Sequence, residues 1–144
     1  MARTTGDIVI DAQPEPIMDV IADLESYPAW ATGVSAVEVL STTSDGRPKQ
    51  VRMTLDSPPI RDSYVIDYTW HGPTRVTWVL SEAGIMLSQL DGAYALESVP
   101  GGTQVTYQLE VDLKIPLLGR LKRKAEKVII DTALRGLKRH VEEG

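Results

Sequence analysis

The chain of 144 residues contains no cysteine. This absence excludes a disulfide framework, a thiolate metal site and a cysteine nucleophile, so packing alone must hold the fold. The sequence also lacks any apolar run near the roughly 20 residues that span a bilayer. Residues 1–7 carry no apolar core of a secretion signal. We therefore expect a cytoplasmic location.

Positive charge is scarce outside the C-terminal region. The formal net charge is -5, which argues against nucleic acid as a partner, because phosphate neutralisation needs a basic surface. Residues 118–144 nevertheless carry eight Lys and Arg against four acids, while the rest of the chain has seven bases against sixteen acids. This basic strip is either a solvated helix face or a surface for transient contact with an anionic membrane through the start of the C-terminal helix.

Histidine is also rare. His71 and His140 lie far apart in the sequence, and without cysteine they do not make a ligand set for a metal such as zinc. The motifs of phosphate loops, dinucleotide-binding folds, zinc proteases and serine hydrolases do not occur. The sequence therefore predicts neither a metal nor a cofactor.

The N-terminal part of the chain, up to Gly33, contains three short predicted elements. Residues 7–12 are β-branched and bounded by polar residues, which predicts a first strand. Pro14 opens a segment whose apolar residues recur at helical spacing up to Leu24, and this pattern indicates a short amphipathic helix. Ser26 and Pro28 can begin a second small helix, which we expect to end near Gly33.

From residue 34 the apolar period changes to two, which is typical of half-buried strands. Six such segments follow with short turns between them, so neighbouring strands should pair antiparallel. After Pro116 the helical period returns to about Glu142, and this helix is the only large cover for the apolar face of the sheet. We predict one α+β domain over residues 1–144, in which a seven-stranded antiparallel sheet wraps a long C-terminal helix and two short helices follow the first strand.

Two sequence segments carry a resemblance to a known family. They are Pro16–Trp30 and Leu90–Glu97, and the order of elements agrees over the whole chain. In these features the chain resembles the START-like (SRPBCC) superfamily, in its polyketide cyclase/dehydratase-like branch. The resemblance implies a helix-grip fold with a cavity between the sheet and the terminal helix. Members range from enzymes to carriers, so the fold alone does not decide function.

The alternation assigns a set of aromatic and polar side chains to the inward face. Asp67 and Asp91 fall in the outward phase, although a one-residue slip would turn either inward. The inward face then offers no side chain that could act as a catalytic base near neutral pH, because an unperturbed tyrosine, with a pKa of about 10, is a poor base. The same inward residues would serve a cavity or a filled core. The predicted lining is Trp30, Tyr64, Tyr68, Trp70, Trp78, Met86, Ser88, Tyr94, Tyr107, Val128 and Thr132.

The turns at one end of the predicted sheet are more apolar than exposed loops require. The parity of the strands brings three of them together beside the basic run 120–124. We interpret this end as a portal that could touch a membrane or a partner protein. Its predicted rim is Pro59, Ile60, Arg61, Ile85, Leu117 and Leu118.

These observations favour binding over turnover. The expected ligand is a small hydrophobic molecule, lipid-like, polyketide-like or aromatic, held in an internal cavity by a carrier or sensor. The first alternative is a polyketide cyclase/dehydratase-type enzyme, for which Arg61, Asp62 and three tyrosines, Tyr64, Tyr68 and Tyr94, would be the residues to test. The second is a protein-interaction module that uses the apolar rim and has a collapsed cavity; the oligomeric state stays open.

Overall fold

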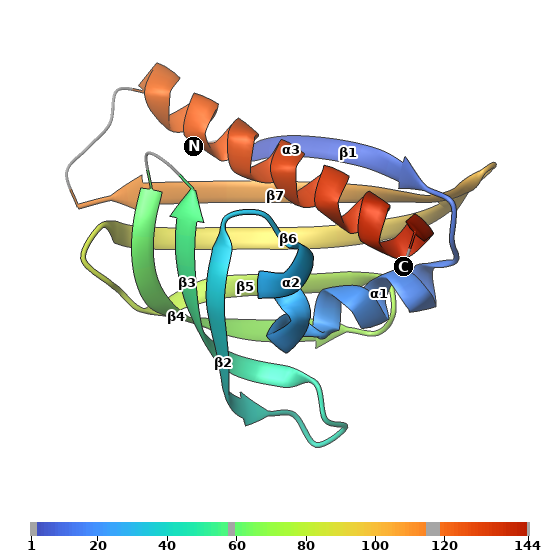
Figure 1. Ribbon diagram of the computed structural model, residues 1–144, viewed down its shortest axis with the longest axis horizontal. Helices are drawn as coiled ribbons and strands as arrows, with labels where there is room; N and C mark the ends of the chain where they lie inside the picture. The colour runs from blue at the N-terminus through green and yellow to red at the C-terminus, as the bar shows by residue number, and fades with distance from the viewer. Residues whose placement is uncertain (1–2, 58–59, 115–118, 144) are drawn as a thin grey trace.

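Strands and helices follow one another in the predicted order in the computed structural model, which describes residues 3–57, 60–114 and 119–143 (Figure 1). The strands are β1 (Thr4–Ile10), β2 (Val34–Thr42), β3 (Pro48–Ser57), β4 (Ile60–His71), β5 (Arg75–Glu82), β6 (Leu87–Val99) and β7 (Gly102–Leu113). The helices are α1 (Pro14–Ala22), the 3-10 turn η1 (Leu24–Ser26), α2 (Tyr27–Trp30) and α3 (Gly119–Glu143).

The seven strands form one antiparallel sheet in the order β1-β7-β6-β5-β4-β3-β2. Five short turns join β2 to β7 as a meander, as the turn residues predict. β1 then pairs with β7 along its whole length, from Thr4 opposite Leu109 to Ile10 opposite Thr103. The predicted fold class is therefore confirmed, although β1 begins at Thr4, three residues before its predicted start.

The long helix α3 crosses one face of the sheet and packs on β1 and β7 (Figure 1). Ala125, Ile130, Leu134 and Leu137 form the apolar part of its buried face. The helix comes close to the sheet at Gly6 of β1, where a Cβ atom would lie 2.6 Å from Cγ2 of Ile130. A side chain at that position would push the helix away from the sheet.

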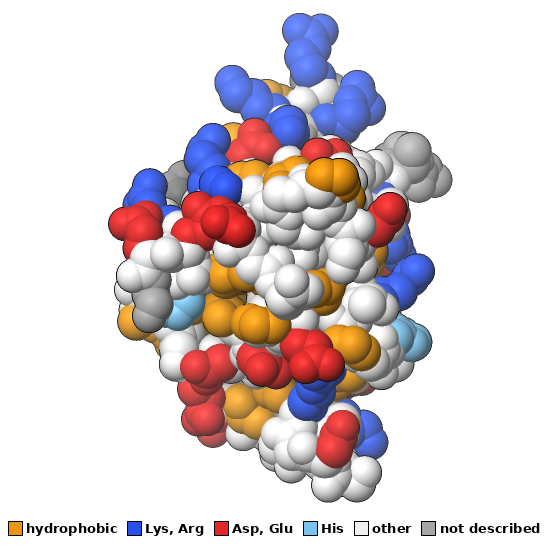
Figure 2. All heavy atoms as spheres, turned by 90° about the vertical axis from the view of Figure 1, so that its right-hand side faces the viewer, with side chains coloured by type: hydrophobic (Ala, Val, Ile, Leu, Met, Phe, Trp, Pro, Cys, Tyr) orange, Lys and Arg blue, Asp and Glu red, His pale blue; other side chains and the backbone are white. Residues whose placement is uncertain are grey.

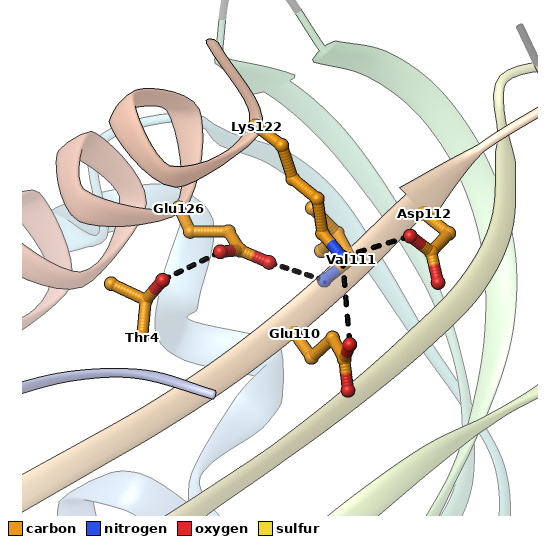
Figure 3. Close-up of polar contacts among 6 residues, drawn as sticks. All are labelled: Thr4, Glu110, Val111, Asp112, Lys122 and Glu126. Carbon is orange, nitrogen blue, oxygen red and sulfur yellow. Dashed lines mark hydrogen bonds and ion pairs between the residues drawn. The ribbon is translucent and has the colours of Figure 1, made fainter. Parts of the chain in front are cut away.

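A buried polar cluster also fixes α3 to the sheet (Figure 3). The Glu126 carboxylate, on a side chain that is 2% exposed, accepts the backbone N–H of Val111 at 2.8 Å and the hydroxyl of Thr4 at 2.6 Å. One turn earlier on the helix, Lys122 pairs with Asp112 of β7 at 2.9 Å. Burial alone would lower the pKa of Lys122, but the bond to Asp112 and nearby carboxylates outweigh burial and raise it.

The short helices α1 and α2 lie on the same face of the sheet as α3 (Figure 1). Pro14 and Pro16 occupy the first turn of α1, where a missing N–H costs little. Ile17 and Ile21 bury the inner side of this helix. The Tyr27 hydroxyl donates to the Ile21 carbonyl at 2.6 Å and so fixes α2 against α1.

The predicted inward phase at the start of β6 is wrong. The register shifts between Leu87 and Gln89, so the intervening Ser88 is an extra residue and its side chain is exposed. Leu87 and Leu90 are buried instead, while Met86 precedes the strand and is half-buried. A β-bulge inverts the alternation on one side of the extra residue, and this explains the error.

The Asp62 carboxylate holds the loop before this bulge. It accepts the backbone N–H groups of Ile85, Met86 and Leu87 at 2.8 to 3.0 Å, and that of Ser63 at 2.9 Å. Burial would raise the pKa of Asp62, but these hydrogen bonds to the charged form outweigh burial and lower it. Asp62, which lies in β4, therefore has a structural role, because it holds the β5–β6 loop.

Candidate ligand cavity

An apolar cavity lies between the concave face of the sheet, α2 and the middle of α3. Its free volume is about 90 Å³. Buried side chains of β3 to β7 line the sheet side, and half-buried side chains of α2 and α3 line the other. We call this space the inner cavity. Within the described residues its lining contains no carboxylate, histidine, lysine or arginine.

Five aromatic rings form the floor of the inner cavity, those of Trp78, Tyr64, Tyr68, Tyr94 and Tyr107. The indole of Trp78 stands at the centre, with ring centroids 5.7 Å from Tyr68 and 5.5 Å from each of Tyr94 and Tyr107. Gly92 is directly opposite Trp78 on β6, and any Cβ there would collide with the indole. The glycine therefore lets Trp78 lie across β6, and the edge-to-face pair of Tyr94 and Tyr107, 4.6 Å apart, extends the aromatic surface.

The phenol groups supply the polar character of this floor. Tyr64, Tyr68, Tyr94 and Tyr107 all line the cavity, and no hydrogen bond joins their hydroxyls to another group in the described part of the chain. Burial raises the pKa of all four, and the neighbouring phenols raise that of the first three further. The hydroxyls therefore stay protonated near neutral pH and can donate hydrogen bonds to a ligand.

The side chains that give access to the inner cavity lie on the helical side. Thr32, after α2, is the exposed member of the lining, and Ile129, Thr132 and Ala133 of α3 are half-buried. The cavity therefore lies nearest to solvent between the α2–β2 connection and the middle of α3.

A second hollow of about 610 Å³ lies outside this opening. We call it the basic hollow because Arg135, Arg139 and His140 of α3 line it, and Glu143 is its one acid among the described residues. Trp30 belongs to the lining of both spaces. The inner cavity and the basic hollow are therefore neighbours that share an indole wall.

Trp30 is held by aromatic and backbone neighbours rather than by hydrogen bonds. Its ring stacks on the imidazole of His140, with centroids 5.0 Å apart and planes at 7°, and Tyr27 meets it edge-on at 5.1 Å. A Cβ at Gly136 would lie 3.6 Å from Cε3 and Cζ3, so the benzo edge of the indole lies against α3. The indole N–H, on the other edge, is buried and has no acceptor in the described structure.

The structure brings seven of the eleven predicted lining residues to the inner cavity and places four elsewhere. Trp70 lies beyond it, where its indole N–H donates to the Pro48 carbonyl at 2.6 Å. Val128 is 45% exposed on the outer face of α3. Met86 and Ser88 are displaced by the bulge described above. The seven lining residues are Trp30, Tyr64, Tyr68, Trp78, Tyr94, Tyr107 and Thr132.

Most of the predicted portal rim lies outside the described residues. This part of the rim consists of Pro59, Leu117, Leu118 and the side chain of Ile60. Of the other two rim residues, Arg61 pairs with Asp56 at 2.9 Å and Ile85 is 83% exposed. Neither lines the inner cavity, whose accessible residues lie at α2 and α3 instead.

Sequence reasoning missed the residues around the opening. Tyr27 and Thr32 flank Trp30 in the chain, and Ala133 follows Thr132 on α3. The signal was present in part, because Tyr27 and Trp30 belong to the segment that carries the family resemblance. Thr32 and Ala133 carry no local signal, since their positions depend on how α3 passes over the α2–β2 connection.

The fold and its enclosed apolar space define the class of protein. A seven-stranded antiparallel sheet that grips a long C-terminal helix is the START-like, helix-grip fold, a ligand-binding architecture. The chain belongs to the family described as polyketide cyclase / dehydrase and lipid transport, whose model matches residues 1–142. Within the described residues, no helix has the length and apolar character to cross a bilayer.

Individual proteins resemble the chain in sequence or in fold. The chain is 26% identical over 118 residues to an uncharacterized protein of Mycobacterium tuberculosis, a match covering 79% of this chain and 66% of the relative. A START superfamily protein from Mycobacterium smegmatis superposes with a TM-score of 0.90 at 19% identity, covering 99% of each chain. The Zhui aromatase/cyclase from Streptomyces sp. R1128 gives 0.76 at 12% identity, covering 98% of this chain and 93% of that one.

Proposed function

We propose that the protein binds a small apolar or aromatic molecule in the inner cavity and carries or senses it without transforming it. The observation that supports this most directly is the composition of the floor: four unpartnered phenol hydroxyls among aromatic and aliphatic side chains. Pockets that bind small molecules combine an apolar lining with a few placed polar groups in this way. The phenols would orient a carbonyl or hydroxyl of the ligand.

Binding is favoured over turnover because of the proton chemistry of the cavity. General acid/base catalysis works best with a group whose pKa lies near the working pH. The only ionisable side chains of the described lining are tyrosines, and burial moves their pKa values away from neutrality. Arg61 and Asp62, the other residues of the enzyme hypothesis, pair with Asp56 and with the β5–β6 loop.

The size of the inner cavity requires a movement for any large ligand. A volume of about 90 Å³ is well below the roughly 300–1,000 Å³ of sites for drug-sized molecules. Trp30 separates this volume from the basic hollow and has no hydrogen bond to break. We infer that the indole swings outward on binding and joins the two spaces.

A fluorescence experiment tests this function. The neutral probe N-phenyl-1-naphthylamine should brighten on binding to the wild-type protein. Ala133→Phe adds a ring to the cavity wall and should weaken probe binding at least about tenfold, a change of about 1.4 kcal/mol. Val128→Phe adds a ring to the exposed face of the same helix and serves as the control. Equal probe affinity in the two variants would contradict binding in the cavity.

Native mass spectrometry of the freshly purified protein supplies the second arm. A retained apolar molecule, identified after solvent extraction, would give the ligand class. If the protein is ligand-free and the probe does not bind, the carrier proposal is wrong. A stable complex with another protein under these conditions would favour the interaction module instead.

We further propose that the ligand is exchanged at an anionic membrane. The observation that favours this is the first part of α3, where exposed cations stand beside the half-exposed apolar side chains of Leu121 and Val128. Figure 2 shows lysine and arginine side chains gathered at the end of the molecule where α3 begins. Each cation near an anionic surface contributes about 1 kcal/mol. The exposed cations are Arg120, Arg123, Lys124 and Lys127.

Sedimentation with lipid vesicles tests the membrane contact. Vesicles rich in phosphatidylserine should retain the protein at low salt, whereas phosphatidylcholine vesicles should not. Lys124→Glu should weaken retention, and Lys49→Glu, on β3, should not. Failure of the anionic vesicles to retain the wild-type protein would contradict the contact and leave the cavity proposal untouched.

A further inference from the structure

We propose that the ligand is an amphipathic acid, whose apolar body occupies the inner cavity and whose anionic group lies in the basic hollow. This inference rests on the proposed function and adds the chemical class of the ligand. It comes from the position of two arginines of α3 directly outside the one indole that closes the cavity. A neutral apolar ligand would have no use for these charges.

The charge of the basic hollow is unbalanced. Arg135 and Arg139 are four residues apart on α3 and both line the hollow. Arg139 lies 3.9 Å from Glu143, a pair in which both side chains are more than two-thirds exposed, so the attraction is weak. Arg135 has no carboxylate within ion-pair distance among the described residues. The guanidinium groups are therefore available to a carboxylate or phosphate, which they can bind with two parallel hydrogen bonds.

The buried indole N–H gives an independent indication. Trp30 Nε1 is the one side-chain nitrogen or oxygen of the described residues that is fully enclosed by protein and has no hydrogen bond, unlike the phenol hydroxyls, which line the inner cavity. The ring of Trp30 lines both spaces. An unmet buried donor destabilises the empty state, so a ligand that supplies an acceptor gains this free energy. The outward swing of the indole inferred above would uncover this N–H, and an acidic group beside the ring would then supply the acceptor.

The two spaces together fit one molecule. The inner cavity provides rings and aliphatic side chains for an apolar body, and the hollow outside provides charge and about 610 Å³ of space. Thr132 lines both spaces and marks the boundary between them on α3. The ligand would therefore enter with its apolar end first and keep its acidic end at the surface.

A matched pair of ligands tests this inference. Decanoic acid and decan-1-ol have the same carbon chain, so their difference in affinity isolates the anionic group. Each would displace N-phenyl-1-naphthylamine from the wild-type protein at pH 7.5 and low salt, with the acid expected to bind about tenfold tighter. This preference should shrink as salt screens the charges.

Two charge-matched variants locate the effect. Arg135→Gln combined with Arg139→Gln should abolish the preference for the acid and leave decanol and the neutral probe unchanged. Arg120→Gln combined with Lys124→Gln removes the same charge from the start of α3 and should keep the preference. Circular dichroism would confirm that both variants are folded.

The outcomes separate this inference from the proposed function. If the neutral probe does not bind the wild-type protein, the proposed function itself fails. If the probe binds but acid and alcohol displace it equally, the ligand is not an acid and this inference is wrong. A preference that survives in the Arg135/Arg139 variant would place the anionic group elsewhere and would also overturn it.

Discussion

The indole of Trp30 lies parallel to the imidazole of His140, with ring centroids 5.0 Å apart and planes at 7°. One ring comes from α2 and the other from the last turn of α3, so the stack closes the wall between the inner cavity and the basic hollow. The ease with which this stack opens should therefore set the rate of ligand entry.

The first prediction concerns this rate. Stacked aromatic pairs contribute about 0.5–1.5 kcal/mol beyond their buried area, so His140→Ala should speed entry of the neutral probe about twofold to twelvefold. Stopped-flow fluorescence would measure the association rate. His71→Ala, in the exposed β4–β5 turn, should leave it unchanged. Equal rates in all three proteins would mean that the ligand enters by another route.

The second prediction compares two glycines. Gly92→Ala forces a methyl group into the indole of Trp78 and should lower the free energy of unfolding by about 1–3 kcal/mol. Gly136→Ala places its methyl 3.6 Å from Trp30, an ordinary contact, and should raise that free energy by about 1 kcal/mol through helix propensity. Urea unfolding followed by circular dichroism measures both, and a stable Gly92→Ala protein would contradict the packing described for the floor.

The third prediction concerns Asp62. Asp62→Asn cannot accept all four backbone N–H groups in the same way and should lose about 1–3 kcal/mol of stability at pH 7. Because the folded protein has the lower pKa, this carboxylate stabilises the fold above the ordinary value of 3.8 and loses its contribution as the pH falls through the lowered value. The difference between wild type and variant should therefore shrink in acid.

Urea unfolding at a series of pH values from 7 to 2 measures this difference. Asp56→Asn is the control, because Asp56 forms only an exposed ion pair with Arg61. A constant difference across the whole range would show that Asp62 does not bind the loop as a carboxylate.

The strands could be predicted from the sequence where alternation is strict. Val105, Tyr107 and Leu109 of β7 are all buried at every second position, as their pattern requires. The start of β6 could not be predicted in the same way. Next to its bulge, the backbone is bound by the Asp62 carboxylate, which comes from β4, more than twenty residues away in the chain. No local pattern in residues 83–90 records that contact.

The phase of α3 was also hidden in the sequence. Its buried face includes Lys122 and Glu126, whose charges are satisfied by β1 and β7. Apolar spacing alone passes over such residues and therefore predicts Val128 as inward, although its side chain is 45% exposed. Trp70 shows a different limit. Strand alternation predicts the face of the sheet on which a side chain lies, but it does not predict how far along the strand the cavity extends.

The fourth prediction follows from this buried cluster. Glu126→Ala leaves the Val111 N–H without an acceptor and removes a charge near Lys122, so it should destabilise the protein by about 3 kcal/mol. Asp131→Ala breaks the exposed pair with Lys127 on the same helix and should cost about 0.5 kcal/mol or less. Thermal and urea unfolding would measure both, and equal losses would mean that the cluster does not anchor α3.

The fifth prediction uses all five tyrosines of the chain. Burial raises the pKa of each, and the hydroxyl of Tyr27 is in addition bonded to the Ile21 carbonyl. The unfolded chain releases these protons near pH 10, whereas the folded chain retains them, so stability should fall as the pH rises above 10. Absorbance at about 295 nm, where phenolate absorbs, should therefore rise in one step that coincides with loss of the circular dichroism signal.

Gradual ionisation near pH 10 in a protein that is still folded would show that solvent already reaches the floor of the cavity. In that case Trp30 would not close the cavity, and the faster entry expected for His140→Ala would lose its physical basis.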